Sequence, residues 1–476
     1  MKKLFFVFLT LCTISGYAQN LVNFERVGEN SLQSLSATYG FPFFLNGVEY
    51  YSVTYETPDV HGVLDTASGL VVVPDQFDKA YPLLCYQHGT LGSKEDVPSN
   101  LQGGFQLAEI WSGLGYVVCA PDLLGLGSSR GFHPYIHAAS EASAAIDMMR
   151  AVKELLPEIE REIHEQVFIT GYSQGGHSAA ALHREIQENL SDEFQITASA
   201  PMSGPYSVSG VMNDFLFSFE PYFFVSYLPY VIISYETVYG NIYEELEDIF
   251  KPEYAALIRP FAEGTKNLEV LNTELVRQLI DDYGASITLR MFRDSVLEAV
   301  AENVDHPINI ALRDNDVFDW TPEAPTRLYY CTADDQVPFM NSVVADSVMN
   351  ANSAPDIEAI DVSPTSDHGE CITPALIQAN FFFNQFKRID FVLNTHDPAL
   401  ATSISVFPNP VSETIFITNE NEEGTLQVVD LTGRTLLQTP LSQGENTLNV
   451  STLEQGVYLL RIQVEDSFFT QKMILE

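Results

Sequence analysis

One serine of this sequence lies in a setting that could make it a nucleophile. Ser173 is the centre of the run GYSQG (171–175), which follows the apolar residues VFIT and precedes the helix-forming stretch SAAALHREI. The pattern Gly-x-Ser-x-Gly between a strand and a helix puts the serine on a sharp turn that exposes its hydroxyl. In this context the pattern predicts a catalytic serine. The other interpretation is a glycine-rich helix entry without chemistry.

A serine hydroxyl needs a base to take its proton, and the base needs an acidic partner that fixes its tautomer. His368 lies in SPTSDHGEC, after the apolar run IEAIDV, and we expect it on a loop that reaches back over the serine. Asp334 lies in the turn after the strand-like run RLYYC, with Asp335 as the second candidate. The chain order Ser, Asp, His is typical of the α/β-hydrolase fold. An Asp-rich turn without a catalytic role is the alternative.

A serine that attacks a carbonyl group forms a tetrahedral intermediate. Two N–H donors are needed to stabilise the oxyanion of that intermediate. We expect the backbone N–H of Gln174, directly after the serine, to supply the first. The run QHGT (87–90) follows the apolar residues PLLCY, where the fold supplies the second donor from a His-Gly turn. We assign that donor to the Thr90 backbone, with Gly89 allowing the turn and His88 shaping it beside the substrate pocket.

The other histidines suit catalysis less well. His177 is one helical turn beyond the serine, and we expect it to point along the helix. His133 and His137 stand four residues apart in FHPYIHA, a spacing that can pair two metal ligands on a helix. Because no third ligand is suggested, we predict a structural or pocket-rim role for this pair. We expect no metal and no cofactor.

The elements that must position these residues form an alternating pattern from residue 82 onward. Short apolar runs alternate with helix-length segments, which indicates a parallel sheet with crossover helices. The expected helices are 140–155 and 174–188, and the expected strands are 83–87, 116–120, 167–170, 197–202, 327–332 and 358–362. We therefore predict a doubly wound, mostly parallel α/β sheet.

A long insertion interrupts this alternation at about 206–309. Its first part, FLFSFEPYFFVSYLPYVIISYETVYGNIY, is aromatic, and its second part is helical and acidic. It lies between the strand after the nucleophile and the strand before the acid, where caps and lids are placed in this architecture. Its aromatic side chains either form a core of their own or line the cleft. We predict a lid with Phe223 and Phe224 in the substrate pocket; a structural subdomain is the alternative.

The last part of the chain has a different pattern. After a linker at 395–402, residues 403–476 alternate apolar and polar positions between turn signals, which predicts a small antiparallel β-sandwich. The blocks SVFPNPVSETIFI, QVVDLTGRTLL, LEQGVYLLRI and QKMILE resemble the C-terminal sorting domain of type IX secretion cargo. The resemblance implies recognition by that secretion machinery and removal of the domain on arrival. A carbohydrate-binding or adhesive sandwich is the alternative.

The central part also resembles a known family. The segments HGT, APDLLGLGSS, HPYIHA, GYSQGG, CTADDQVP and SDHG, spread over about 45–390, are similar to the secretory lipase and esterase branch of the α/β hydrolases. The resemblance implies cleavage of carboxylic esters, often of lipids, by a domain spanning 19–394. A serine peptidase of the same fold acting on short peptides is the second hypothesis. A non-catalytic surface binding protein is the third.

The N-terminus and the composition bear on location and partners. Residues 1–18 place two lysines before an apolar run that ends at small residues, as in a cleaved signal peptide. The run is shorter than the roughly 20 residues of a membrane-spanning helix, the alternative interpretation. A formal charge of -41 argues against nucleic acid and anionic membrane surfaces as partners. We therefore expect a secreted or surface-located protein.

Four cysteines remain after loss of the predicted signal peptide. Cys85, Cys119 and Cys331 lie in apolar, strand-like runs where a reduced cysteine is a common filler. Export also permits disulfides. If one disulfide forms, we expect it between Cys331 and Cys371, because the segments that carry the acid and the histidine must converge.

Overall fold

The computed structural model describes residues 20–40, 43–391, 403–430, 434–464 and 467–476. The predicted signal peptide at 1–18 and linker at 395–402 lie outside these ranges. Within them, no helix is both long enough and apolar enough to cross a bilayer.

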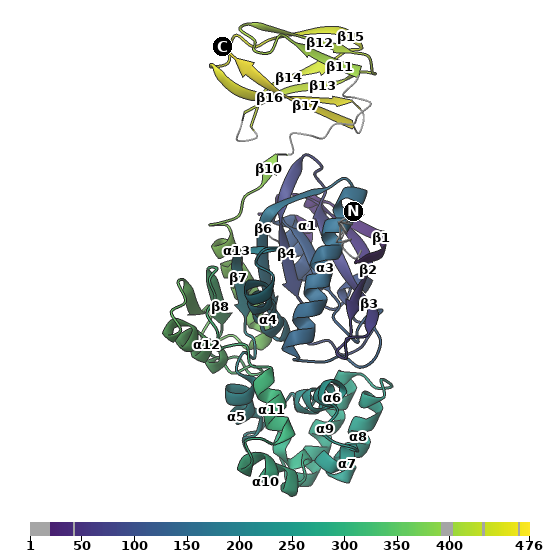
Figure 1. Cartoon of the computed structure of the whole chain (residues 1–476), viewed down its shortest axis with the longest axis vertical. Helices are drawn as coiled ribbons and strands as arrows, with labels where there is room; N and C mark the ends of the chain where they lie inside the picture. The colour runs from purple at the N-terminus through teal and green to yellow at the C-terminus, as the bar shows by residue number, and fades with distance from the viewer. Residues whose placement is uncertain (1–19, 41–42, 392–402, 431–433, 465–466) are drawn as a thin grey trace, which may run out of the picture.

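The central element is a ten-stranded mixed sheet (Figure 1). Its main strand order is β1-β2-β3-β5-β4-β6-β7-β8-β9, and β10 pairs with β4. The strands from β5 to β9 in this order run parallel, whereas β1, β2 and β3 pair antiparallel. The bounds are β1 Leu21–Asn30, β2 Val48–Pro58, β3 Leu64–Pro74, β4 Lys79–Gln87, β5 Val117–Pro121, β6 Glu162–Tyr172, β7 Gln195–Met202, β8 Thr326–Tyr330, β9 Ile357–Asp361 and β10 Asp390–Phe391.

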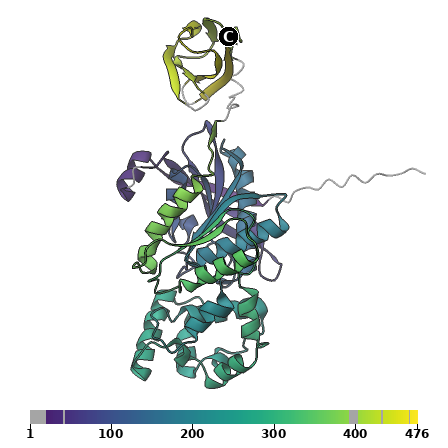
Figure 2. The same ribbon diagram turned by 90° about the vertical axis from the view of Figure 1, so that its left-hand side faces the viewer.

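Helices cover both faces of this sheet (Figure 2). The bounds are α1 Leu32–Tyr39, α2 Phe105–Gly113, α3 Ala138–Glu158, α4 Gln174–Asn189, α12 Met340–Ala351 and α13 His368–Phe383. One core contains apolar side chains of α3 and α4, and another contains those of α1, α2 and α13. Successive residues of β4 alternate between the two cores, with Leu83 and Cys85 in one and Leu84 and Tyr86 in the other.

All six strands and both helices expected from the sequence are present, and the predicted α/β class is confirmed. The three antiparallel strands at the N-terminal edge, β1 to β3, had not been predicted. They extend the sheet beyond the parallel part, so that β3 borders β5. The nucleophile, acid and histidine candidates all follow strands of the parallel part, at the carboxyl ends where open α/β sheets place their ligands.

Between β7 and β8 the chain forms a helical insertion at one end of the sheet (Figure 1). The α-helices are α5 Asn213–Leu216, α6 Tyr227–Tyr239, α7 Leu246–Ile249, α8 Pro252–Ala262, α9 Leu268–Tyr283, α10 Asp294–Glu302 and α11 Pro307–Asp314, with a π-helical turn at Val208–Met212. These helices share a large hydrophobic core that also takes in Tyr135, Ile136 and Val337 from the neighbouring loops. The insertion therefore packs directly over the loops at the carboxyl ends of the strands.

The C-terminal part consists of two antiparallel sheets, as predicted. One has the order β11-β12-β15 and the other β14-β13-β16-β17. Apolar residues of both sheets form a common core, the arrangement of a β-sandwich. The bounds are β11 Ile404–Phe407, β12 Thr414–Asn419, β13 Gly424–Val429, β14 Thr435–Leu441, β15 Gly444–Asn449, β16 Gly456–Val464 and β17 Ser467–Leu475.

Candidate active site

Ser173 occupies the turn between β6 and α4. Its backbone has φ 62° and ψ −123°, a conformation that L-residues rarely adopt and that holds its side chain on the sharp turn. The flanking glycines make this turn possible by close packing. A Cβ atom on Gly175 would lie 2.0 Å from the Gln87 carbonyl oxygen, and one on Gly171 would lie 2.2 Å from the Gly175 oxygen.

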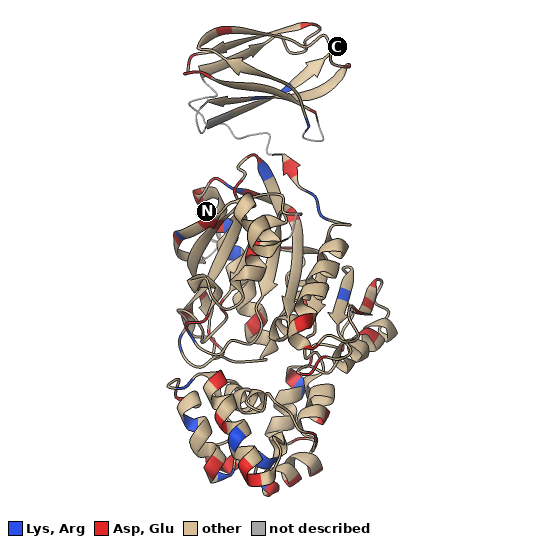
Figure 3. Ribbon diagram, turned by 180° about the vertical axis from the view of Figure 1, so that it is seen from behind, with Lys and Arg blue, Asp and Glu red and all other residues tan. Residues whose placement is uncertain are grey.

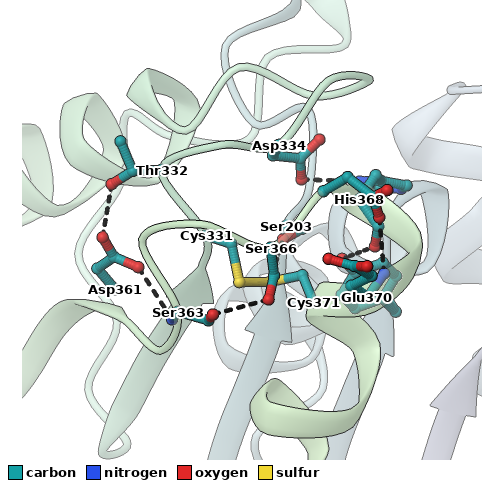
Figure 4. Close-up of a disulfide and its surroundings, with 12 residues drawn as sticks. Ser203, Cys331, Thr332, Asp334, Asp361, Ser363, Ser366, His368, Glu370 and Cys371 are labelled. Carbon is teal, nitrogen blue, oxygen red and sulfur yellow. Dashed lines mark hydrogen bonds and ion pairs between the residues drawn. A yellow bond between two sulfur atoms is a disulfide. The ribbon is translucent and has the colours of Figure 1, made fainter.

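The predicted acid and base lie in direct contact (Figure 4). His368 Nδ1 is 2.7 Å from Asp334 Oδ2, and the Asp334 side chain is buried. The other carboxylate oxygen of Asp334 accepts the backbone N–H groups of Gln336 and Val337 at 3.0 and 2.8 Å. Asp335 contacts only the backbone of His368, whose N–H donates to its Oδ1 at 3.2 Å. Of the two candidates, Asp334 therefore meets the imidazole.

His368 is not on a loop, which corrects the sequence-based expectation. It is the first residue of α13, and Asp367 caps the helix by accepting the N–H of Glu370 at 2.8 Å. The start of a helix can also position a catalytic base, because it fixes the backbone of His368 while the ring contacts Asp334.

Tyr172 links His368 to the nucleophile turn. Its hydroxyl donates to the His368 carbonyl oxygen at 2.6 Å, and the centroids of the two rings are 5.0 Å apart. Since Tyr172 directly precedes Ser173, the start of α13 is held beside the serine. The three predicted residues are thus gathered from β6, the turn after β8 and α13.

A disulfide joins the segments of the acid and the histidine. Cys331 and Cys371 are bonded, which is the pairing expected from the sequence (Figure 4). Cys331 lies three residues before Asp334, and Cys371 lies three residues after His368. The other two cysteines in the described chain, Cys85 and Cys119, are buried and free, as expected of core fillers.

The two expected oxyanion donors belong to segments next to the serine. Gln174 is the first residue of α4, where backbone N–H groups have no partner within the helix. A Cβ atom on Gly89 would lie 3.7 Å from the Ser173 Cβ, so the turn that carries Thr90 passes beside the nucleophile. Within the described chain, no hydrogen bond is formed by the backbone N–H of Thr90 or Gln174. Both groups remain available as donors.

His88 is buried beneath the turn at residues 87–90 and does not line the substrate pocket. The ring is buried, with Nδ1 at 2.7 Å from the Gly89 oxygen and Nε2 at 3.1 Å from the Asp122 oxygen. The predicted shaping of the turn agrees with these contacts. The predicted place of His88 beside the substrate is wrong, because both ring nitrogens contact backbone carbonyl oxygens.

An apolar cavity of about 50 Å³ extends from the nucleophile beneath the insertion. Ser173 and Gln174 form one end. The insertion supplies most of the remaining wall, together with residues from the loops after β5 and β8. The lining residues beyond the catalytic turn are Tyr135, Ile136, Pro205, Val208, Met212, Asn213, Leu216, Phe217, Tyr227, Leu228, Val231, Leu312, Gln336 and Val337.

Phe223 and Phe224, predicted for the pocket, are not among these residues. Phe223 is 63% exposed, and Phe224 stacks on Tyr227 with ring centroids 5.5 Å apart. Other aromatic residues of the insertion divide between the two expected roles, since Tyr222 is buried in its core whereas Phe217 lines the cavity. The aromatic segment therefore lines the cavity through Phe217 and Tyr227, and the specific prediction of Phe223 and Phe224 is wrong.

The segment FHPYIHA contributes to the site through Tyr135, which the sequence pattern did not indicate. Tyr135 lines the cavity, and its hydroxyl lies 2.8 Å from Thr90 Oγ1. The two histidines have local partners, with His133 Nδ1 at 2.7 Å from the Leu124 oxygen and His137 Nδ1 at 2.9 Å from Ser140 Oγ. In the described part of the chain, no group of three or more His, Cys, Asp or Glu residues is arranged to hold a metal.

The C-terminal sandwich matches a known family. Residues 405–476 match the model described as the secretion system C-terminal sorting domain. This part of the chain is a secretion sorting domain. The resemblance read from its four sequence blocks is thereby confirmed. No curated protein sequence matches the chain.

The part before the sorting domain resembles solved esterases and lipases. The rice cell wall degrading esterase LipA from Xanthomonas oryzae has a TM-score of 0.70 and 28% identity, covering 78% of this chain and 100% of LipA. Candida antarctica lipase A shares the fold, with a TM-score of 0.58 and 14% identity over 77% of this chain and 83% of the lipase. These matches confirm the predicted α/β-hydrolase fold of the esterase and lipase type.

Proposed function

We propose that this chain is an exported serine hydrolase that cleaves carboxylic esters with Ser173, His368 and Asp334. One observation carries the proposal. The histidine ring contacts Asp334 at 2.7 Å, while its helix start is bound to Tyr172, the residue that precedes the strained serine. The likeness to the esterase LipA supports ester cleavage as the reaction.

In the proposed reaction, Ser173 Oγ attacks the ester carbonyl carbon while His368 Nε2 takes the hydroxyl proton. Asp334, bound to Nδ1, keeps the imidazole in the required tautomer and stabilises its charged form. The N–H groups of Thr90 and Gln174 bind the oxyanion. The intermediate expels the alcohol, which takes the proton from His368, and leaves an acyl-enzyme. Water then repeats the sequence, releasing the carboxylic acid and restoring the serine.

We assign the apolar cavity beneath the insertion to the acyl chain. Its walls are aliphatic and aromatic apart from a few amide and hydroxyl groups, and it begins at Ser173 and Gln174. Each methylene that leaves water for such walls contributes about 0.8 kcal/mol of binding. Medium acyl chains are therefore favoured over acetate.

We assign a wider groove on the other side of the oxyanion turn to the alcohol. It has a volume of about 490 Å³ and is open to solvent. Its lining is mixed in polarity and includes Tyr86, Thr90, Leu101, Gln102, Gln106 and Leu107. Such a groove accepts alcohol groups of varied size, whereas the narrow cavity selects the acyl chain.

Charge favours an ester over a peptide as the substrate. None of the residues that line the cavity is a lysine or an arginine, so no cation there can bind a peptide carboxylate.

Acidic residues spread over every part of the molecule (Figure 3), and the sequence has 64 acidic and 23 basic residues. This charge opposes binding of nucleic acid and other polyanions.

Export would use both ends of the chain. The sorting domain implies an interaction with the secretion machinery, and residues 1–18 have the pattern of a signal peptide. A chain truncated at residue 394 should hydrolyse esters normally in a heterologous host but remain in the periplasm of its own cell. Full-length protein that retains the block around Asn409 in the native medium would contradict cleavage of the domain.

Active-site labelling tests the proposed chemistry. A fluorophosphonate should label the wild-type protein at Ser173, and Ser173→Ala should abolish both labelling and hydrolysis of p-nitrophenyl butyrate. His368→Ala should lower turnover by several orders of magnitude with little change in melting temperature, because the triad acts as one unit. If Ser173→Ala retained more than about a tenth of the activity, the nucleophile assignment would be wrong. Parallel assays with aminoacyl anilides would reveal peptidase activity.

A further inference from the structure

Below the nucleophile turn, the side chain of Gln174 enters a buried polar cluster. Its Nε2 donates to Glu141 Oε1 on α3 at 2.9 Å and lies 2.9 Å from His133 Nε2. All three residues are buried. The proposed triad does not use this cluster, although its central residue is the one that follows the nucleophile.

The protonation of His133 fixes the direction of the Gln174 amide. His133 Nδ1 lies 2.7 Å from the Leu124 carbonyl oxygen, so Nδ1 carries the proton and Nε2 is an acceptor. Burial lowers the pKa of His133 to about 4, which keeps the ring neutral at pH 7. The amide nitrogen of Gln174 thus faces two acceptors, Nε2 of His133 and the carboxylate of Glu141. A flipped amide would place its oxygen against both.

Glu141 is held in its charged form by His177. Its Oε2 lies 2.7 Å from His177 Nδ1, and His177 Nε2 lies 2.8 Å from the Asn315 carbonyl oxygen. The His177 ring is thus fixed between the carboxylate of Glu141 and the carbonyl oxygen of Asn315. Burial raises the pKa of Glu141, but the charge of His177 and the hydrogen bonds from His177 and Gln174 outweigh it and leave the pKa below its usual value.

We propose that Glu141, paired with His177, is a positioning residue that anchors Gln174 so that its backbone N–H faces the oxyanion. The inference rests on the proposed function. The first N–H groups of a helix point away from its body, and their direction depends on how the first turn is held. Here the side chain of the first residue of α4 is fixed on α3, which prevents rotation of that turn. The contact with His177 also pairs a carboxylate that would otherwise oppose the oxyanion.

The same cluster connects the insertion to the nucleophile helix. Asn315 follows α11, and its side chain accepts the Ala138 N–H at 2.8 Å and donates to the Tyr239 hydroxyl at 3.0 Å. Because its carbonyl oxygen binds His177, the end of the insertion, the start of α3 and the first turn of α4 share one hydrogen-bonded unit. We therefore expect displacement of any member to change the position of Gln174.

Two substitutions and their combination test the inference on the full-length protein. Gln174→Ala keeps the backbone N–H and the Glu141–His177 pair but removes the anchor, and Glu141→Ala removes the anchor point. Each should lower kcat for p-nitrophenyl butyrate about 10- to 100-fold with KM within about threefold, since loss of one oxyanion donor elsewhere costs about 100- to 1000-fold. Binding of a boronic acid that mimics the tetrahedral intermediate should weaken in parallel. The double variant should be no slower than the slower single variant.

Glu141→Gln is the conservative variant. Its oxygen can accept from Gln174 and its nitrogen can donate to a neutral His177, so kcat should return to within about fivefold of the wild type. Glu158→Gln, an exposed position on the same helix, serves as the matched control and should leave kcat unchanged.

Several outcomes would overturn the inference. They are wild-type kcat in folded Gln174→Ala, additive effects in the double variant, and a loss in Glu141→Gln as large as in Glu141→Ala. If Glu141→Ala fails to fold, Gln174→Ala decides the question, because it leaves the buried ion pair intact. Failure of fluorophosphonate to label Ser173 in the wild type would instead overturn the proposed function.

Discussion

The carboxylate of Asp334 binds His368 through one oxygen and two backbone N–H groups through the other. Nδ1 of His368 lies 2.7 Å from Oδ2, while Gln336 and Val337 donate to Oδ1. The backbone therefore holds one oxygen of the carboxylate while the other contacts the imidazole, and this arrangement determines what a substitution at Asp334 would do.

Asp334→Asn should lower kcat by about 10,000-fold without loss of folding. The amide oxygen would keep the two backbone N–H bonds, so the amide nitrogen would face His368 Nδ1 and hold the imidazole in the wrong tautomer. The matched control is Asp335→Asn, whose oxygen can still accept the His368 N–H and which should stay within about tenfold of the wild type. Steady-state kinetics on p-nitrophenyl butyrate measures both. The reverse order of effects would move the acid to Asp335.

The disulfide should matter for both stability and turnover. Removing it by the double substitution Cys331→Ala and Cys371→Ala should lower the free energy of unfolding by about 2 to 4 kcal/mol, because a long chain segment is released in the unfolded state. Turnover should also fall, since the bridge joins the segments that carry Asp334 and His368. Dithiothreitol should reproduce both effects in the wild type and change nothing in the double variant. Equal melting temperatures with and without the bridge would contradict this prediction.

The apolar cavity should set acyl-chain preference. Val231→Phe, which narrows the cavity, should lower kcat/KM for p-nitrophenyl octanoate at least about tenfold while acetate changes less than about twofold. Phe223→Ala is the control, because Phe223 is exposed and does not line the cavity. Equal losses on both esters would show that the insertion is a structural cap. An effect of Phe223→Ala limited to octanoate would restore the original pocket prediction.

The sequence predicts local features well where one pattern has one physical cause. The parallel strands could be predicted because their buried apolar runs are bounded by turns. Ser173 could be predicted because its Gly-x-Ser-x-Gly pattern stands between a strand and a helix. The helix start at His368 also had a signal, since Asp367 precedes Glu370 by three residues, the spacing in which a cap accepts an N–H.

Features that depend on packing between distant segments were not predictable in the same way. Phe223 and Phe217 are both aromatic and lie six residues apart, yet only Phe217 lines the cavity. Their difference arises from how the helices of the insertion pack. The contact of Glu141 with Gln174 joins residues 33 positions apart. No periodicity marks such a pair, because each residue is an ordinary polar position within its own segment.

Buried histidines should make the fold sensitive to mild acid. Within the described chain, neither ring nitrogen of His183 has a hydrogen-bond partner, and its ring packs edge-on against Trp320 with centroids 4.8 Å apart. Burial lowers the pKa of His183 to about 3, against about 6.5 in an unfolded chain. Between these values the unfolded state binds more protons than the folded state. The contribution of neutral His183 to the free energy of unfolding is therefore fully present above about pH 6.5 and is lost as the pH falls toward 3.

His183→Leu should remove one part of this pH dependence. A lowered histidine pKa of this kind costs about 2 kcal/mol at pH 5 relative to pH 7.5, so the wild type should lose that much more stability over the interval than the variant. Urea unfolding at the two pH values measures the difference. Burial lowers the pKa values of His133 and His137 to about 4. These two residues should cause the dependence of stability on pH that remains in the variant. Parallel stability curves for the two proteins would mean that His183 is not the neutral buried group that the structure indicates.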